Sequence, residues 1–254
     1  MKRRYKVIIG TLLLIMSILS SFILKDKESI LGQGAINLSR PIYRVKVEEK
    51  VISLTFDINW AENDELDNIL NVLDKYNVKG TFFIMGGWVN YSEDNKNKLI
   101  NIYERGHEIG NHSYIHPMFT KISDDRIKEE IEKTEKVFMD NLGINSKLFR
   151  FPSGDYNEKS YNYVNSLGYQ SIQWDVDSLD WKEYGADSEY NRVIDKVYNG
   201  SIVLFHNNAK YTPGNLDKII SKLKNEDYKF ITVGEMIYKE DFYIDEKGEQ
   251  NKKN

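Results

Sequence analysis

The sequence contains no cysteine, and only four of its 254 residues are histidine. The lack of cysteine excludes disulfide scaffolds, thiol catalysis and cysteine-based zinc sites. Basic residues are not in excess either, because 35 Lys and Arg stand against 39 Asp and Glu, giving a net charge of −4. Dedicated nucleic-acid binders usually have a basic excess, so we expect no nucleic-acid partner. Hydrophobic residues, at 41%, suffice for a sizeable core.

Charge is absent from one long apolar stretch, residues 7–24. As a helix this stretch would span roughly 27 Å, close to the hydrocarbon thickness of a bilayer. The basic segment 1–6 before it is expected in the cytoplasm, with the remainder of the chain extracellular. Because the run is long for a signal peptide and no A-x-A cleavage site follows, we favour a single-pass transmembrane anchor in the cell membrane over the cleaved signal segment of a secreted protein. Residues 25–42 then form a polar linker.

Strand and helix patterns alternate through the rest of the chain. The predicted strands are residues 51–56, 80–85, 107–111, 148–151, 169–176, 201–206 and 228–233. Apolar residues at helical spacing, together with capping residues, predict helices at 64–76, 92–103, 123–143, 157–168, 187–200 and 215–225. We assign residues 43–238 to one α/β domain and residues 239–254 to a charged, frayed tail.

This alternation requires right-handed crossovers and a parallel sheet. No G-x-G-x-x-G segment follows the first strand, which disfavours a dinucleotide-binding fold. About seven strand–helix units favour a parallel (β/α)7–8 barrel, closed or nearly closed, over an open sheet.

Unusual polar residues stand at the carboxyl ends of several predicted strands. They are Asp57, His112, His116, Arg150, Asp175, Asp177, Asp180 and His206. In a parallel barrel these ends share one face, and that face carries the active site. The sequence therefore predicts that these side chains converge on one pocket.

Each of these residues also has a simpler interpretation. His112 and His116, four apart on a helical turn, can hold one divalent cation as neutral imidazoles, or they are surface and capping residues. Asp57 after an apolar strand can cap the next helix. Arg150 lies between two phenylalanines and must find an anion, for which Asp57 is the partner we nominate. His206 alone would be interpreted as a hydrogen-bonded core histidine.

The segments TFD, NHSYIHP, RFPSG, DSLDW and LFH, in this order, resemble the five motifs of the NodB-homology polysaccharide deacetylases. The resemblance covers about residues 48–238. The first motif, FDINW, is most similar to the sporulation-type branch, and the asparagine before His112 resembles the muramic-acid-lactam type. The resemblance implies a distorted (β/α) barrel that removes acetyl groups from N-acetylated sugars.

The resemblance also implies roles for single residues. Asp57 matches the general base, Arg150 the residue that orients it, and His206 the general acid. An aspartate of the fourth motif tunes His206, and we favour Asp177 over Asp180. The metal ligands are His112 and His116. Substrate contacts are implied or expected for Ser153 (through its backbone N–H), Gly154, Tyr156, Trp60, Trp181 and Leu204, the last two around the acetyl methyl group.

One position departs from the family pattern. Most members have a second carboxylate directly after the base, and it serves as the third metal ligand, but here that residue is Ile58. Asn59 can offer only a neutral amide oxygen. The cofactor we expect is a divalent metal, zinc before cobalt or manganese, in a weak site completed by Asn59 or water. The alternatives are a metal-independent deacetylase and a domain that binds glycan without cutting it.

From the sequence we therefore expect a monomeric, membrane-anchored extracellular hydrolase that deacetylates a cell-wall glycan, namely peptidoglycan. The combination of Asp57, Arg150 and His206 favours activity, because glycan binding alone has no use for that set. The rival from another class is a catalytically degenerate glycan-binding protein of the cell wall or spore, supported by Ile58. A sugar isomerase or another metal hydrolase on a similar barrel is a weaker third candidate.

Overall fold

The computed structural model describes residues 40–253. The predicted basic segment, the apolar run 7–24 and almost all of the linker lie outside the described residues. Within residues 40–253, no helix is both long and apolar enough to span a bilayer.

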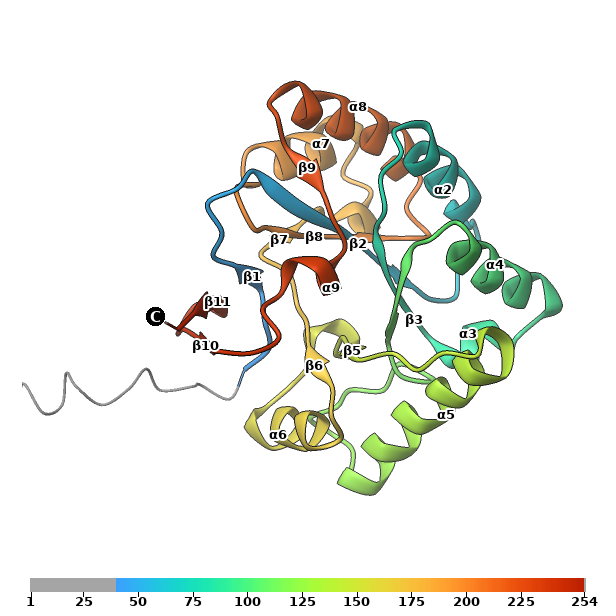
Figure 1. The fold of residues 1–254 in the computed structure, drawn as a ribbon. Coiled ribbons are helices and arrows are strands. Elements are labelled where there is room, and N and C mark those ends of the chain that lie inside the picture. The colour runs from blue at the N-terminus through green and yellow to red at the C-terminus, as the bar shows by residue number, and fades with distance from the viewer. Residues whose placement is uncertain (1–39, 254) are drawn as a thin grey trace, which may run out of the picture. The chain divides into compact units, whose positions relative to one another are not determined.

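The central feature is a curled parallel sheet with helices around it (Figure 1). Its strand order is β6-β5-β4-β3-β2-β8-β7, and β9 pairs with the beginning of β2. The strands are β2 (Val51–Ile58), β3 (Thr81–Ile84), β4 (Glu108–Asn111), β5 (Leu148–Phe149), β6 (Gln170–Ser171), β7 (Val176–Asp177), β8 (Ile202–His206) and β9 (Lys229–Phe230). All of these pairings are parallel, as the alternation of strands and helices predicted.

The barrel is incomplete, because the strand order ends at β6 and β7. The predicted strand 169–176 is in fact divided between these two short strands. The segment before β2 bridges the two sides, since Ile42 pairs with Ile172 beyond β6 and Arg44 pairs with Ser201 before β8.

The helices follow the strands in the predicted order. They are α2 (Leu66–Lys75), α3 (Gly86–Val89), α4 (Glu93–Glu104), α5 (Asp124–Leu142), α6 (Glu158–Ser166), α7 (Ala186–Ile194), α8 (Thr212–Asn225) and α9 (Val233–Met236), with 3-10 turns η1 (Pro152–Gly154) and η2 (Asp180–Lys182). Ser92, Ser123 and Asn157 each accept a hydrogen bond from a backbone N–H in the first turn of α4, α5 and α6. Gly143 ends α5 at a φ of 70°, as its position predicted.

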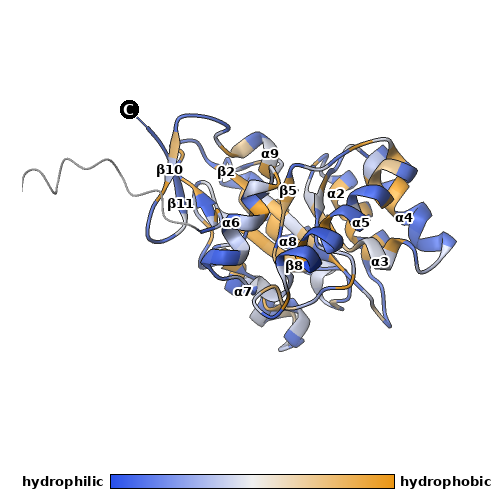
Figure 2. Ribbon diagram, turned by 90° about the horizontal axis from the view of Figure 1, so that it is seen from below, coloured by the Kyte–Doolittle hydropathy of each residue, from blue (hydrophilic) through white to orange (hydrophobic). Residues whose placement is uncertain are grey.

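The core lies between the sheet and the inner faces of the helices (Figure 2). Leu54, Phe56 and Ile58 of β2 are fully buried there. Asp57, between two of them in sequence, points to the other side of the strand, because successive side chains of a strand alternate. The core therefore anchors the strand that presents Asp57.

The expectation of a frayed tail is wrong. β10 (Phe242–Ile244) and β11 (Glu249–Lys252) form a small sheet with β1 (Arg44–Val45), in which β1 is parallel and β10 antiparallel to β11. Ile244 and Gln250 are buried, and the Gln250 side chain exchanges two hydrogen bonds with the backbone of Tyr238. The charged composition conceals this pairing, because the buried residues are few and scattered.

Candidate active site

The register of the sheet brings the predicted residues together. Asp57 of β2 pairs with His206 of β8, and Asn111 at the end of β4 pairs with Phe149 of β5. Their successors, His112 and Arg150, therefore lie at the same end of the sheet. The pocket at this end has a volume of about 360 Å³ and is lined by Asp57, Asn59, His112, His116, Ser153, Trp174, Trp181, Leu204, His206 and Asn208. Four of the eight predicted side chains, Asp57, His112, His116 and His206, therefore line one pocket. Asp175 does not join them, because it accepts hydrogen bonds from the Ser201 hydroxyl and the Ile202 backbone N–H at the beginning of β8, the opposite end of that strand.

Asp57 and Arg150 form the buried ion pair that the sequence predicted. Arg150 Nη1 donates to Asp57 Oδ1 at 2.7 Å, and Arg150 Nη2 donates to the carbonyl oxygen of Gln173 at 3.0 Å. Arg150 is fully buried, with its guanidinium 4.0 Å from the centre of the Phe83 ring. Burial raises the pKa of Asp57, but Arg150, His112 and His206 together lower it below its ordinary value. Asp57 is therefore an ionised base at neutral pH.

The two histidines meet in a loop and not on the helical turn expected from their spacing. Ser113 and His116 have φ values of 66° and 62°, which no helix contains. Buried Glu130 of α5 holds the loop by accepting the backbone N–H groups of Tyr114 and Ile115 at 2.8 Å each. The rings of His112 and His116 lie 5.0 Å apart, centre to centre. The side-chain brace from α5 was not anticipated from the sequence.

His112 has the tautomer of a metal ligand. Its Nδ1 lies 3.0 Å from the carbonyl oxygen of Arg150 and must carry the proton to bond there. Its buried Nε2 has no hydrogen-bond partner among residues 40–253 and lies 3.5 Å from Asp57 Oδ2. Burial lowers the pKa of His112 to about 4 and also lowers that of His116. Two neutral imidazoles therefore face the pocket, which suits a divalent cation.

Position 58, where the family pattern places a carboxylate as the third metal ligand, is occupied by isoleucine. Ile58 is fully buried in the core and faces away from the pocket. Residues 40–253 contain no cluster of three His, Cys, Asp or Glu side chains placed to hold a metal ion. Asn59 lines the pocket, and the buried Asn207 side chain holds its backbone by two hydrogen bonds of 3.1 Å. The donor set thus fits a cation in part, with two imidazoles and an amide.

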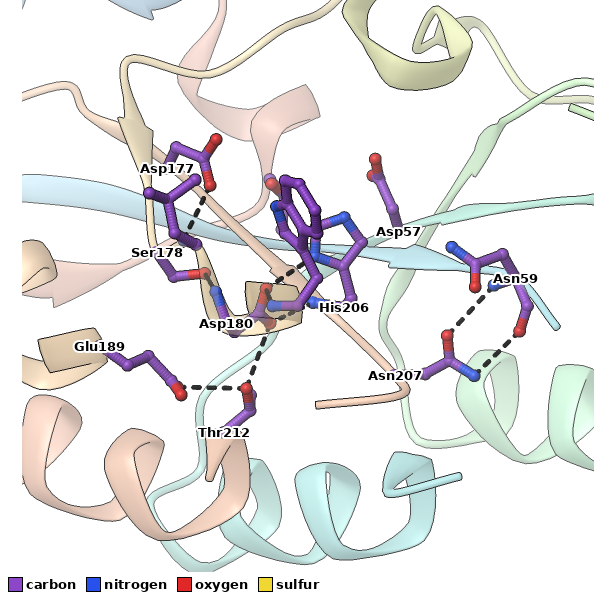
Figure 3. Close-up of polar contacts among 12 residues, drawn as sticks. Asp57, Asn59, Asp177, Ser178, Asp180, Glu189, His206, Asn207 and Thr212 are labelled. Atoms are coloured by element: carbon purple, nitrogen blue, oxygen red, sulfur yellow. Dashed lines mark hydrogen bonds and ion pairs between the residues drawn. The ribbon is translucent and has the colours of Figure 1, made fainter. Parts of the chain in front are cut away.

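Asp180, and not Asp177, is the partner of His206, so the preference for Asp177 is wrong (Figure 3). Asp180 Oδ1 lies 2.7 Å from His206 Nδ1, and Oδ2 accepts the His206 backbone N–H at 2.7 Å. Asp177 instead accepts the backbone N–H of Leu179 at 2.8 Å. Leu179 has a φ of 53° and reverses the chain, which brings η2 beneath the end of β8. A left-handed leucine cannot be anticipated from residue type.

His206 is positioned to carry a proton. Burial lowers its pKa, but Asp180, Asp57 and Asp177 outweigh burial and raise the pKa above the ordinary value. Because His206 Nδ1–H donates to Asp180, Nε2 is the ring nitrogen that can donate a proton to a substrate in the pocket. His206 therefore presents an acid beside the base Asp57.

The other predicted contacts divide into two groups. Ser153, Trp181 and Leu204 line the pocket, and Ser153 has a φ of 54°. The remaining three, Trp60, Gly154 and Tyr156, do not line it. Tyr156 bonds the Tyr43 hydroxyl at 3.0 Å, and the Trp60 ring lies over Gly87. Trp174 and Asn208 also line the pocket.

Comparisons with known proteins agree with this geometry. A sequence model of the polysaccharide deacetylase family matches residues 44–172. The chain is 32% identical over 197 residues to the uncharacterized protein YlxY of Bacillus subtilis, covering 78% of this chain and 60% of that relative. It is 32% identical over 206 residues to the peptidoglycan-N-acetylmuramic acid deacetylase PdaA of the same organism. This match covers 80% of this chain and 77% of PdaA. The chain thus spans about three fifths of the length of YlxY.

Two solved structures are informative. The Bc1960 peptidoglycan N-acetylglucosamine deacetylase has a TM-score of 0.73 at 31% identity, covering 77% of this chain and 92% of that one. BA3943 from Bacillus anthracis, described as a CE4 family pseudoenzyme, has a TM-score of 0.72 at 33% identity. This match covers 78% of this chain and 69% of BA3943. A mutant of BA3943 is described as having restored enzymatic activity. Family match, sequence identity and shared fold agree: this chain belongs to the polysaccharide deacetylase family.

Proposed function

We propose that this protein hydrolyses the acetamido groups of peptidoglycan sugars, releasing acetate and a free amine. The observation that carries the proposal is the pairing of Asp57 with His206 on adjacent strands β2 and β8. One is a buried carboxylate with a lowered pKa and the other an imidazole with a raised pKa. Amide hydrolysis needs such an ionised base and protonated acid within reach of one substrate.

Four residues have separate roles in this reaction. Asp57 removes a proton from the attacking water, while the Arg150 cation keeps the carboxylate ionised and oriented. His206 donates its proton from Nε2 to the leaving amine. General acid catalysis of this kind typically raises the reaction rate about 10²–10⁴-fold. Ser153 lines the pocket, and its backbone N–H would bind the developing oxyanion, a contribution of about 3–4 kcal/mol for a good donor.

A divalent cation fits the same pocket through two ligands. His112 and His116 would hold it, and Asn59 Oδ1 or water would complete the set. A bound cation polarises a carbonyl and acidifies water, from a pKa of ~15.7 to about 7 in the best zinc sites. Zinc is the first candidate, and cobalt or manganese also accept imidazole.

The test is acetate release by the full chain from peptidoglycan and from N-acetylglucosamine oligomers. Asp57→Asn and His206→Ala should each abolish release while the circular dichroism spectrum is retained. A His107→Asn control changes a histidine that bonds Gly80 and does not line the pocket, and it should keep activity. Equal release by the two active-site variants would refute the assignment of base and acid.

A second candidate is a glycan-binding protein without catalysis. Ile58 in the core, where most family members place a metal-binding carboxylate, favours it, and the similar BA3943 structure is described as a pseudoenzyme. This candidate predicts that the protein sediments with isolated cell wall yet releases no acetate with any of zinc, cobalt, manganese or nickel. Acetate release above the Asp57→Asn background excludes it.

We also propose that the domain acts outside the cell, held at the membrane by residues 7–24, as a monomer with a role in sporulation or wall maturation. The support is the charge asymmetry around the apolar run and the nature of the substrate. Protease treatment of intact protoplasts tests the orientation, because an extracellular domain is degraded and a cytoplasmic one is protected.

A further inference from the structure

A chain of hydrogen bonds continues behind the Asp180–His206 pair (Figure 3). The Thr212 hydroxyl, at the first residue of α8, lies 3.1 Å from Asp180 Oδ2 and 3.1 Å from Glu189 Oε1 of α7. Thr212 is fully buried, and Asp180 and Glu189 are 2% and 4% exposed. The two carboxyl groups therefore share one hydroxyl in a place that water hardly reaches.

The hydroxyl has a single proton, so it cannot donate to both carboxyl groups. Asp180 also accepts the backbone N–H groups of His206 and Trp181 and the Nδ1–H of His206. Several donors on one carboxyl group stabilise its ionised form. If Thr212 donates to Asp180, the contact between Glu189 and Thr212 is a hydrogen bond only when Glu189 carries a proton.

The surroundings of Glu189 favour this protonated form. Burial and the nearby charge of Asp180 raise the pKa of Glu189 to about 7, against smaller opposing effects of Asn215 and Thr212. From η2 the charged group that faces Glu189 is Asp180, and from α8 the groups are the neutral Thr212 and Asn215. Arg192, the cation of α7, is occupied with the carbonyl oxygen of Asp177 at 2.7 Å.

We propose that Glu189 and Thr212 extend the Asp180–His206 pair into a four-residue relay in which Glu189 is a positioning residue that sets the acidity of His206. Protonated Glu189 donates to Thr212, and Thr212 donates to Asp180. When Glu189 releases its proton to solvent, a negative charge is added behind Asp180, and His206 holds its own proton more tightly. Asp57 of β2 and Asp177 of β7 act on His206 as well, but they do not contact Thr212.

The consequence for catalysis rests on the proposed role of His206 as general acid. As pH rises through neutrality, ionisation of Glu189 keeps the imidazole protonated to higher pH than Asp180 alone would. The relay thus extends the alkaline side of the activity profile.

The experiment is a carbon-13 NMR titration of the full chain in detergent, labelled at histidine Cε1, with EDTA present to remove cations. Only four histidine signals occur, and the His206 signal is assigned by its loss in His206→Ala. Glu189→Gln keeps a donor to Thr212 without ionising and should lower the apparent pKa of His206 by about half a unit or more. Glu132→Gln, on the exposed side of α5, is the matched control and should leave the His206 curve unchanged.

Two results would overturn the relay. One is a His206 titration curve that is the same in Glu189→Gln as in the unchanged protein. The other is an equal shift of the His206 curve in Glu132→Gln and in Glu189→Gln, because the effect would then not depend on the contact with Thr212. Both readouts are independent of acetate release, so loss of the relay and loss of the proposed activity are separately observable. Where activity is present, the alkaline limb of kcat should move to lower pH in Glu189→Gln.

Discussion

Asp180 binds His206 at two points, the backbone N–H and the ring Nδ1, at 2.7 Å each. One carboxylate therefore fixes both the end of β8 and the rotation of the imidazole. The same contact raises the pKa of His206 against the effect of burial, so that the folded state favours the imidazolium. Asp180 alone therefore fixes both the protonation and the orientation of the proton donor His206.

The first prediction separates Asp180 from Asp177. Asp180→Asn removes the charge that holds the His206 proton and should lower kcat for acetate release by about 10²-fold or more, within the range for a general acid. Asp177→Asn is the matched control, because Asp177 bonds Leu179 and not His206, and its effect should be small. Equal losses in the two variants would contradict the assignment. Kinetics on N-acetylglucosamine oligomers provide the measurement.

The second prediction concerns the buried ion pair. Asp57→Asn leaves the Arg150 guanidinium without its anion in the core and should lower the free energy of unfolding by about 3–5 kcal/mol at pH 7. Asp217→Asn removes the acid of the exposed Lys75–Asp217 pair and should lower the free energy of unfolding far less, because solvent screens an exposed ion pair. Urea unfolding at constant pH measures both. A change at Asp57 no larger than the change at Asp217 would argue against a buried charge pair.

The third prediction follows from the pKa of Asp57, which is lower in the folded state than in the unfolded chain. A lowered carboxyl pKa contributes stability at pH values above the unfolded pKa of about 4, and that stability is lost as pH falls through the folded value. The difference in unfolding free energy between the unchanged protein and Asp57→Asn should therefore narrow as pH falls below about 4. A difference that stays constant down to pH 2 would be inconsistent with this linkage.

The fourth prediction tests whether position 58 can supply a ligand. Ile58 is fully buried among core residues, so Ile58→Asp should lower the free energy of unfolding by several kcal/mol, because an unpaired carboxyl group would enter the core. Ile58→Val, the matched control, should lower it by about 0.5–1.5 kcal/mol. Denaturant unfolding and zinc calorimetry are the measurements. A stable Ile58→Asp variant that binds zinc more tightly would show that the end of β2 turns toward the pocket.

The fifth prediction uses the neutral histidines. Because burial holds the pKa of His112 at about 4, zinc binding should persist at pH 5.5, where an ordinary imidazole is mostly protonated. His112→Ala should weaken binding at least tenfold, and His107→Asn should not change it. Calorimetry at pH 7.5 and 5.5 gives the affinities. Zinc binding that disappears between these two pH values would contradict a lowered pKa of the histidine ligands.

Much of the site could be predicted because it depends on alternation and register. Once β2, β4, β5 and β8 are recognised as parallel strands, Asp57, His112, Arg150 and His206 must lie at one end of the sheet. The ion pair between Asp57 and Arg150 followed from the need of a buried guanidinium for an anion.

The parts that could not be predicted depend on local backbone conformation. Positive φ angles at Leu179 and His116 decide which aspartate reaches His206 and how the two imidazoles meet. Leucine seldom adopts such a conformation, and histidine adopts it too rarely for a sequence to indicate the position. The brace from Glu130 and the relay through Thr212 join residues far apart in the chain. Helical and strand periodicity carry no information about such contacts.

The small sheet of β1, β10 and β11 has a consequence for how the domain can be connected. Arg44 of β1 pairs with Glu249 of β11, so the first and last strands of the described domain are neighbours. A short linker would be enough to join them, and circular permutation with new ends in an exposed loop should leave the pocket assembled. A surface or a fused protein attached before β1 or after β11 would therefore lie on the same side of the domain, next to the small sheet.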